Sequence, residues 1–168
     1  MIKKFFAVAL IALASVTTFA QKFGSINSAD IMQIMPERQA AETELQTLQS
    51  QYQEELNYMK DEYEKKVEDY KKQRETLPDN IRQRREQEIM DSEDKINEYL
   101  QNCDRNINEK AAQLQNDIVT KLMKAIQAVG EEGAYVCIFD IANGSVPFVS
   151  STLTTDVTEA VKAKLGIK

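Results

Sequence analysis

Residues 74–86 read RETLPDNIRQRRE, and they interrupt the longest regular pattern in the chain. Residues 37–129 contain no glycine, and Pro78 is the only proline among them. Proline lacks a backbone N–H and disfavours the helical conformation of the residue before it, so a helix is expected to end or to kink here. Asp79 or Asn80 would then cap a second helix.

Both flanking segments carry a narrow row of apolar or small side chains at helical spacing. Each row advances in steps of three and four residues and repeats every 11 residues, which gives about 3.67 residues per turn and a nearly straight seam. The first row runs through Ala41, Leu45, Leu48, Tyr52, Leu56, Met59, Tyr63, Val67 and Tyr70. The second row runs through Ile96, Leu100, Cys103, Ile107, Ala111, Leu114, Ile118, Leu122, Ala125 and Val129.

The matched repeat bears on how the two segments are arranged. One continuous kinked rod would leave both rows facing water, whereas a chain that folds back at Pro78 buries each row against the other. The sequence therefore favours an antiparallel helical hairpin over residues 36–130, with its turn at residues 77–80, and the kinked rod is the alternative. Pro36 suits the first helical position, and Gly130 suits the end of the second helix.

The C-terminal region has a different composition. AYVCIFDI (134–141) and VPFVS (146–150) are rich in β-branched and aromatic residues, which favour strands. Asn143 and Gly144 lie between them and form a strong signal for a tight turn. The sequence therefore predicts a C-terminal β-hairpin.

The predicted fold is mainly α with a small β part. Residues 21–35 and 131–168 form a short-stranded β body, from which the hairpin projects as a coiled-coil arm. In the first part a strand over 23–26 precedes a short helix capped by Ser28. In the second part Asp156 and Glu159 would cap a final short helix, which Gly166 ends.

Residues 1–20 have the layout of a cleaved export signal. Two lysines precede an apolar run at residues 5–14, and Ala20 suits cleavage before Gln21. The run is shorter than the roughly 18–20 residues that span a bilayer. The sequence therefore predicts an exported protein that is soluble after processing.

Composition excludes several kinds of function. The formal charge is −6 at pH 7, and an acidic chain is poorly suited to binding nucleic acid. The chain has no histidine, so histidine catalysis and histidine metal sites are excluded. It also lacks a glycine-rich phosphate loop. Its many carboxylates are expected on solvated helix faces, so we predict neither an enzyme nor a cofactor.

The two cysteines are predicted to lie far apart. Cys103 falls in the second apolar row and Cys137 in a predicted strand, and the helix between them would separate them by roughly 40 Å. A disulfide needs Cα atoms within about 7 Å, so they are not expected to pair within one chain. Cys137 could instead meet its counterpart in another copy.

Positive charge is concentrated around the predicted turn. Residues 65–85 contain eight basic and four acidic side chains, whereas residues 37–64 and 86–117 each carry a balance of −6. These basic residues either belong to an ordinary solvated helix face or form a tip that contacts acidic clients or anionic lipid headgroups. They are Lys65, Lys66, Lys71, Lys72, Arg74, Arg82, Arg84 and Arg85.

Some apolar side chains fall outside both rows. Tyrosine and methionine offer adaptable apolar surface for varied partners. Tyr58 and Tyr99 are therefore added to the basic tip as candidate client-binding residues, and Met90 and Met123 also lie off the rows.

The order of these elements resembles the Skp/OmpH family of periplasmic chaperones over essentially the whole mature chain. The most telling stretches are FGSINSADIMQIMPE (23–37), YVCIFDIANGSVPFVS (135–150) and Asp156-Val157-Thr158. The resemblance implies a jellyfish-shaped homotrimer, in which strands of three copies form a small barrel and three arms enclose unfolded outer-membrane proteins. Short strands with open edges need strands from other copies in any case.

The resemblance implies an ATP-independent holdase of the periplasm, which keeps its clients soluble by binding their unfolded state. The best-known member is strongly basic, whereas positive charge here is confined to the tip. A different class of protein, an envelope coiled coil that binds one fixed partner, is the alternative function.

Overall fold

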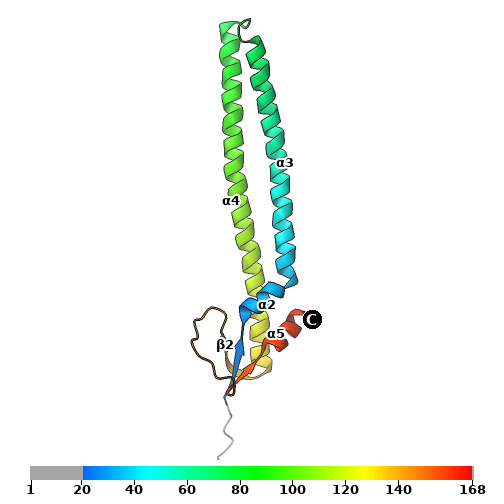
Figure 1. Ribbon diagram of the computed structural model, residues 1–168, viewed down its shortest axis with the longest axis vertical. Helices are drawn as coiled ribbons and strands as arrows, with labels where there is room; N and C mark the ends of the chain where they lie inside the picture. Colours follow the sequence, from blue (N-terminus) through cyan, green and yellow to red (C-terminus); the bar gives the residue numbers. More distant parts are fainter. Residues whose placement is uncertain (1–20, 168) are drawn as a thin grey trace, which may run out of the picture. The chain divides into compact units, whose positions relative to one another are not determined.

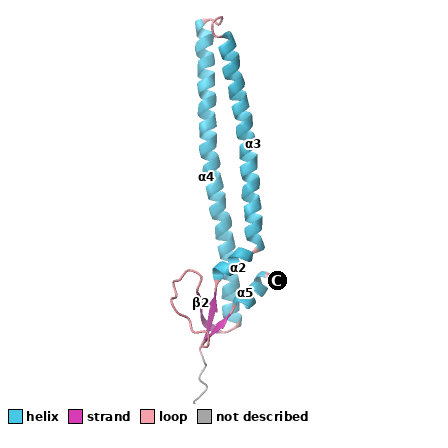
Figure 2. Cartoon of the chain, in the orientation of Figure 1, coloured by secondary structure: helices cyan, strands magenta, loops and turns pink. Residues whose placement is uncertain are grey.

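The structure, a computed structural model, describes residues 21–167 of the chain (Figures 1 and 2). These residues form two compact units. The hairpin unit comprises residues 32–121, and the sheet unit comprises residues 21–31 together with 122–167. The predicted export signal lies outside the described residues.

The hairpin unit contains two long helices that run side by side in opposite directions (Figure 1). They are α3 (Pro36–Gln73) and the greater part of α4 (Asp79–Glu132). Contacts between them confirm the antiparallel pairing, because residues that come later in α3 contact residues that come earlier in α4. Glu44 pairs with Lys110 at 2.7 Å, Tyr52 accepts from Asn106 at 3.2 Å, and Ser92 accepts from Lys66 at 3.0 Å. The alternative of one kinked rod is therefore wrong.

The chain reverses within residues 74–78, as Pro78 predicts. The cap of α4 differs from the expectation, because Asp79 is already helical and its carboxylate pairs with Arg82. The carbonyl of Pro78 accepts the first backbone hydrogen bonds of α4, from Ile81 at 3.0 Å and from Arg82 at 2.9 Å. Proline cannot donate, but its carbonyl is free to begin a helix.

The apolar row of α3 matches its prediction residue by residue. Between positions 38 and 70, all nine side chains of the predicted row are buried or half-buried, and every other side chain is exposed. Ala41 and Leu56 are the most deeply buried of them, at 8% and 7% exposure. The 11-residue repeat therefore identifies the face of α3 that meets α4.

The sheet unit is built on three parallel strands in the order β2-β1-β3. They are β1 (Lys22–Ile26), β2 (Tyr135–Asp140) and β3 (Thr154–Asp156). The predicted C-terminal β-hairpin is wrong, because residues 146–150 form no strand and β2 and β3 lie on opposite sides of β1. Asn143 lies in a turn and Gly144 has a φ of 65°, so the local turn signal is correct but the pairing is not.

The hairpin prediction missed a long-range pairing, because β2 pairs with β1 and not with residues 146–150. β1 pairs with β2 along its whole length, from Lys22 opposite Tyr135 to Ile26 opposite Asp140. The next hydrogen bond continues in the same direction, from the N–H of Ile141 to the carbonyl of Ile26 at 2.9 Å. A local turn motif predicts a reversal of the chain, but it carries no information about pairing with a strand that is distant in the sequence.

Two short helices, α2 (Ser28–Ile34) and α5 (Thr158–Leu165), complete the sheet unit, although the last residues of α2 belong to the hairpin unit. The most buried side chains of the sheet unit come from the strands, α2, the C-terminal end of α4 and the start of α5. They are Ile26, Ile31, Leu122, Val157 and Val161, each at most 2% exposed. Gly24 keeps β1 close to this core, since a Cβ there would lie 3.0 Å from Ile138 and 3.2 Å from Val157.

Two helix ends differ from their predictions. Ser28 is the first residue of α2, and Asn27 provides the cap by accepting a 3.4 Å hydrogen bond from the N–H of Asp30. α4 continues through Gly130 and ends at Glu132.

Before α5, Asp156 accepts a 2.8 Å hydrogen bond from the N–H of Thr158, the first residue of the helix. This half of the predicted cap is present. Glu159 pairs with Lys162 at 2.9 Å instead of returning to Asp156. Gly166, with a φ of 74°, ends the helix as predicted.

Candidate functional site

The hairpin gathers the eight predicted basic residues around its turn. Four lie in the last three turns of α3, one lies in the turn itself, and three lie in the first two turns of α4. We call this set the basic tip: Lys65, Lys66, Lys71, Lys72, Arg74, Arg82, Arg84 and Arg85. Segments on either side of Pro78 therefore contribute to one charged region, as the sequence predicts for a hairpin.

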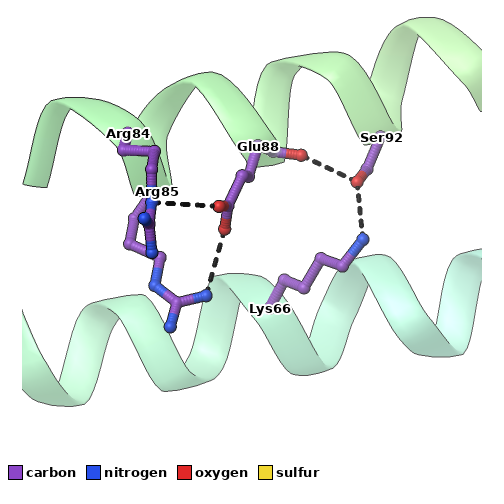
Figure 3. A network of polar contacts seen from close by, with 5 residues as sticks. All are labelled: Lys66, Arg84, Arg85, Glu88 and Ser92. Carbon is purple, nitrogen blue, oxygen red and sulfur yellow. Dashed lines mark hydrogen bonds and ion pairs between the residues drawn. The ribbon is translucent and has the colours of Figure 1, made fainter. Parts of the chain in front are cut away.

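One acidic residue organises part of the basic tip (Figure 3). The carboxylate of Glu88 accepts from Arg84 at 3.3 Å and from Arg85 at 3.0 Å. Lys66 donates to the hydroxyl of Ser92, which in turn donates to the backbone carbonyl of Glu88 at 2.8 Å. Two guanidinium groups share one carboxylate, so this network keeps a net positive charge.

Other members of the basic tip are less constrained. Lys72 pairs with Glu68 at 3.5 Å, and its side chain is 70% exposed. Within the described residues, Lys65, Lys71 and Arg74 form no ion pair. Exposed ion pairs contribute little free energy, about 0–1 kcal/mol each, so most of these cations are available to another anion.

A small cavity of about 120 Å³ lies between the helices beside the basic tip. Its polar lining includes Lys66 and Arg85, and its apolar lining includes Leu77 and Ile89. Tyr70 also lines it and donates to Glu86 across the hairpin. Partial burial and the hydrogen bond to Glu86 raise the pKa of Tyr70. This end of the hairpin is thus held by polar contacts over half-buried side chains.

Tyr58 lies on the exposed surface of α3, as predicted for a residue outside the apolar row. Its side chain is 59% exposed, and its hydroxyl donates to Glu62 at 3.0 Å. That hydrogen bond raises the pKa of Tyr58. Met90 and Met123 are also exposed, at 57% and 58%.

Tyr99 does not lie outside the apolar row, and its predicted placement is wrong. Its ring meets that of Tyr52 edge-on, with centroids 6.1 Å apart. Partial burial and the neighbouring Cys103 thiol raise the pKa of Tyr99 to about 12. Leu100, the predicted member of the row, is 38% exposed instead. Steps of three and then four residues from Ile96 lead to Tyr99 and Cys103, so Tyr99 lies on the face of α4 that meets α3.

Four exposed apolar side chains of the sheet unit were not singled out from the sequence. They are Val136 at 61%, Ile141 at 44%, and Phe148 and Leu153 at 79%. A signal for the last three does exist, because they lie in residues 141–155, which contain no charged side chain in a protein that is 29% charged.

The cysteines are both free, as predicted. Cys103 is buried between the helices, whereas Cys137 is exposed on β2.

Two searches of the described residues complete the survey. No group of three or more acidic residues or cysteines is arranged there to hold a metal ion. None of the helices found between residues 21 and 167 is both long enough and apolar enough to cross a membrane.

The fold and its charged turn define a class of protein: a long antiparallel helical hairpin joined to a small parallel sheet. Within that class, the chain belongs to the family described as outer membrane protein (OmpH-like), whose sequence profile matches residues 22–165.

A solved structure agrees with this assignment at the level of the fold. It is that of a proposed outer membrane chaperone (OmpH-like) from Caulobacter crescentus CB15, which matches with a TM-score of 0.71 and 14% sequence identity. The match covers 86% of this chain and 83% of that one. No curated protein matches the chain.

Proposed function

We propose that this protein is a periplasmic chaperone that binds unfolded outer-membrane β-barrel proteins without ATP and keeps them from aggregating. The observation that carries the proposal is membership of the OmpH-like family across residues 22–165, which supports a chaperone-type role. The likeness to the Caulobacter protein supports the fold, and the function proposed for that protein agrees in kind.

The surface of the hairpin unit suits a holding chaperone. Such a protein lowers the free concentration of unfolded chains by binding them in preference to the folded state. Exposed apolar side chains such as Tyr58 and Met90 offer contacts of low specificity, and the unpaired cations Lys65, Lys71 and Arg74 offer charge to acidic clients. Neither kind of contact involves a nucleotide or a catalytic step.

The proposal includes two finer statements. The protein assembles as a homotrimer through the sheet unit, where open strand edges and exposed apolar side chains call for partners. The basic tip contacts acidic segments of clients and, in a second role, anionic lipid headgroups.

A light-scattering assay with unfolded outer-membrane proteins tests the proposal. Substoichiometric to equimolar protein is expected to suppress the aggregation of several unrelated β-barrel clients after dilution from denaturant. Protection of a single client, with saturable binding to that one partner, would favour an envelope adaptor instead.

Paired variants test the role of the basic tip. Lys65, Lys71, Lys72 and Arg74 are changed to Ser in one variant, and Arg38, Lys60, Lys95 and Arg105 are changed to Ser in its control. Both sets remove the same charge from the hairpin unit, and each contains one residue paired with a glutamate four positions away. The tip variant is expected to bind an acidic client about tenfold more weakly at low salt. Equal binding by the two variants would remove the tip from the proposal.

A further inference from the structure

We propose that the Asn143-Gly144 pair is a site of spontaneous modification, at which the side-chain amide of Asn143 is replaced by a carboxylate. The backbone nitrogen of Gly144 attacks the side-chain carbonyl carbon of Asn143, and the amide group leaves as ammonia with the proton of that nitrogen. Water then opens the cyclic imide at either of its carbonyl carbons, which gives aspartate or isoaspartate. Water is the only co-reactant, and the inference is independent of the proposed chaperone function.

The attacking nitrogen is free to react. The N–H of Gly144 makes no well-formed hydrogen bond to any described residue. Gly144 has a φ of 65°, and an added Cβ would meet no heavy atom within 4 Å beyond its chain neighbours, so this backbone has room to rotate. Asn143 and Gly144 are both exposed, which admits the water that opens the imide. Two groups of one chain react readily once they are able to align.

The topology of the sheet leaves this turn without strand pairing on both sides. In the β-hairpin that the sequence predicts, hydrogen bonds between the two strands would hold the pair. In the structure β2 pairs with β1, and the last donors before the turn are Ile141, to the carbonyl of Ile26, and Ala142, to the carboxylate of Asp140. Among the described residues, the next backbone N–H that donates is that of Leu153. The pair therefore begins a loop whose backbone is held only near its ends.

The other eight asparagines of the chain are held differently. In seven of them, which lie within α3 or α4, the N–H of the following residue donates to a carbonyl one helical turn earlier. The eighth, Asn27, precedes Ser28, whose N–H donates to Asp140 at 3.2 Å. The side chain of Asn27 accepts from the N–H of Asp30 at 3.4 Å, so both of its reacting groups are occupied. The seven helical asparagines are Asn57, Asn80, Asn97, Asn102, Asn106, Asn108 and Asn116.

The modification changes a surface that is otherwise uncharged. A carboxylate at position 143 gives residues 141–155 their only charged side chain. Asp140, which accepts from Ser28 and Ala142, lies three residues away, at most about 11 Å between Cα atoms. The Debye length is about 8 Å at physiological ionic strength, so the two carboxylates repel each other weakly. Isoaspartate has a further local effect, because it adds one carbon atom to the backbone of the loop.

Peptide mapping of the folded wild-type protein tests the proposal. The purified protein is incubated at neutral pH, and samples taken over time are digested and analysed by mass spectrometry. Amide loss is expected at least about tenfold faster at Asn143 than at any other asparagine. The products should be two peptides of equal mass, of which an isoaspartate-specific methyltransferase modifies one. An intact Asn143, equal loss at Asn27, or aspartate as the only product would overturn the proposal.

Ser28→Gly provides a matched control, because it creates a second Asn-Gly pair in the same chain. The backbone N–H of residue 28 still donates to Asp140, so amide loss at Asn27 should remain at least about tenfold slower than at Asn143 in the folded protein. In concentrated urea, where neither pair is held by the fold, the two rates should become similar. Equal rates in the folded protein would show that the structure does not select the site, and would overturn the inference.

Gly144→Ala tests the role of the glycine. A Cβ on the attacking residue hinders its alignment and disfavours positive φ, so amide loss at Asn143 should fall at least about tenfold. Ser145→Ala is the control, since it changes an exposed neighbour without altering the attacking nitrogen, and its rate should equal that of wild type. Circular dichroism should show the same helix content for both variants. An unchanged rate in Gly144→Ala would overturn the assignment of Gly144 as the attacking residue that makes the site reactive.

Discussion

The hydroxyl of Ser28 donates a 2.5 Å hydrogen bond to Oδ2 of Asp140, a residue 112 positions later in the chain. The N–H of Ser28 donates to Oδ1 of the same carboxylate at 3.2 Å, and the N–H of Ala142 does so at 3.0 Å. One carboxylate at the end of β2 therefore accepts from the first residue of α2 and from the loop that follows β2. A negative charge is also favoured at the start of a helix.

Loss of this charge is expected to weaken the sheet unit. Asp140→Asn should lower the free energy of unfolding by about 1–2 kcal/mol, because hydrogen bonds to a charged acceptor are replaced by weaker ones. Hydrogen exchange of the β1 and β2 amides is the suitable measurement, since it reports on the sheet directly. Asp30→Asn is the control, because Asp30 is an exposed acid in the first turn of α2, the helix whose first residue donates to Asp140. Equal effects of the two substitutions would contradict the prediction.

The same carboxylate makes stability depend on pH. Partial burial acts to raise the pKa of Asp140, but the hydrogen bonds from Ser28 and Ala142 outweigh it and leave the pKa lowered. The hydrogen bonds from Thr158 lower the pKa of Asp156 in the same way. A lowered native pKa means that the contribution is complete above the ordinary value, about 3.9, and is lost as pH falls through the native value.

A comparison across pH checks this sign. Wild type should exceed Asp140→Asn in stability at pH 7, and the difference should shrink as pH falls below about 4. Thermal or urea unfolding of both proteins between pH 7 and pH 3 provides the measurement. A difference that grows toward low pH would be inconsistent with a lowered pKa.

Ala134 offers a stabilising substitution. It follows the end of α4 and adopts a φ of 51°, in the left-handed region that disfavours a Cβ. Ala134→Gly removes this strain but loosens the unfolded chain, so a net gain of about 0.5–1 kcal/mol is expected in urea unfolding. The control has the opposite sign, because Ala128→Gly inside α4 should cost about 0.5–1 kcal/mol. Destabilisation by both would show that the backbone at 134 is not strained.

The contact between Tyr99 and Tyr52 distinguishes the observed seam from the predicted one. Tyr99→Ala should destabilise the hairpin unit by about 2–3 kcal/mol, because it removes a half-buried ring from between the helices. Leu100→Ala should cost well under about 1 kcal/mol, since this side chain is partly exposed and alanine favours helix. Denaturation followed by circular dichroism measures both. A larger loss of stability for Leu100→Ala than for Tyr99→Ala would indicate that Leu100, and not Tyr99, packs between the helices.

The hairpin was predictable from the sequence because its determinants are local and repeated. Pro78 marks the reversal, and the 11-residue repeat identifies every side chain of the α3 row. The repeat fails at one position of α4, where Tyr99 and Leu100 are adjacent and both suit the seam by polarity. Composition alone does not decide between them, because the decision depends on which partner side chain, here Tyr52, lies opposite.

Two of the three strands of the sheet, β1 and β2, were predicted from the sequence, but β3 and the topology were not. The strand at Tyr135–Asp140 was expected, whereas its parallel pairing with β1 depends on residues more than a hundred positions away. In the candidate site, the basic tip follows directly from charge spacing and the turn. The exposed side chains of residues 141–155 were not singled out, because their apolar character resembles that of an ordinary strand until the structure shows them without a partner.

The register of β1 with β2 has a consequence for how such proteins vary in size. These strands are neighbours in the sheet, but α2, α3 and α4 all lie between them in the sequence, so the long helices are an insertion between neighbouring strands. Because the apolar rows recur every 11 residues, removing or duplicating one matched block from each helix would keep the remaining contacts in phase. The length of the hairpin can therefore change, in evolution or by engineering, in increments of about 16 Å without redesign of the strands.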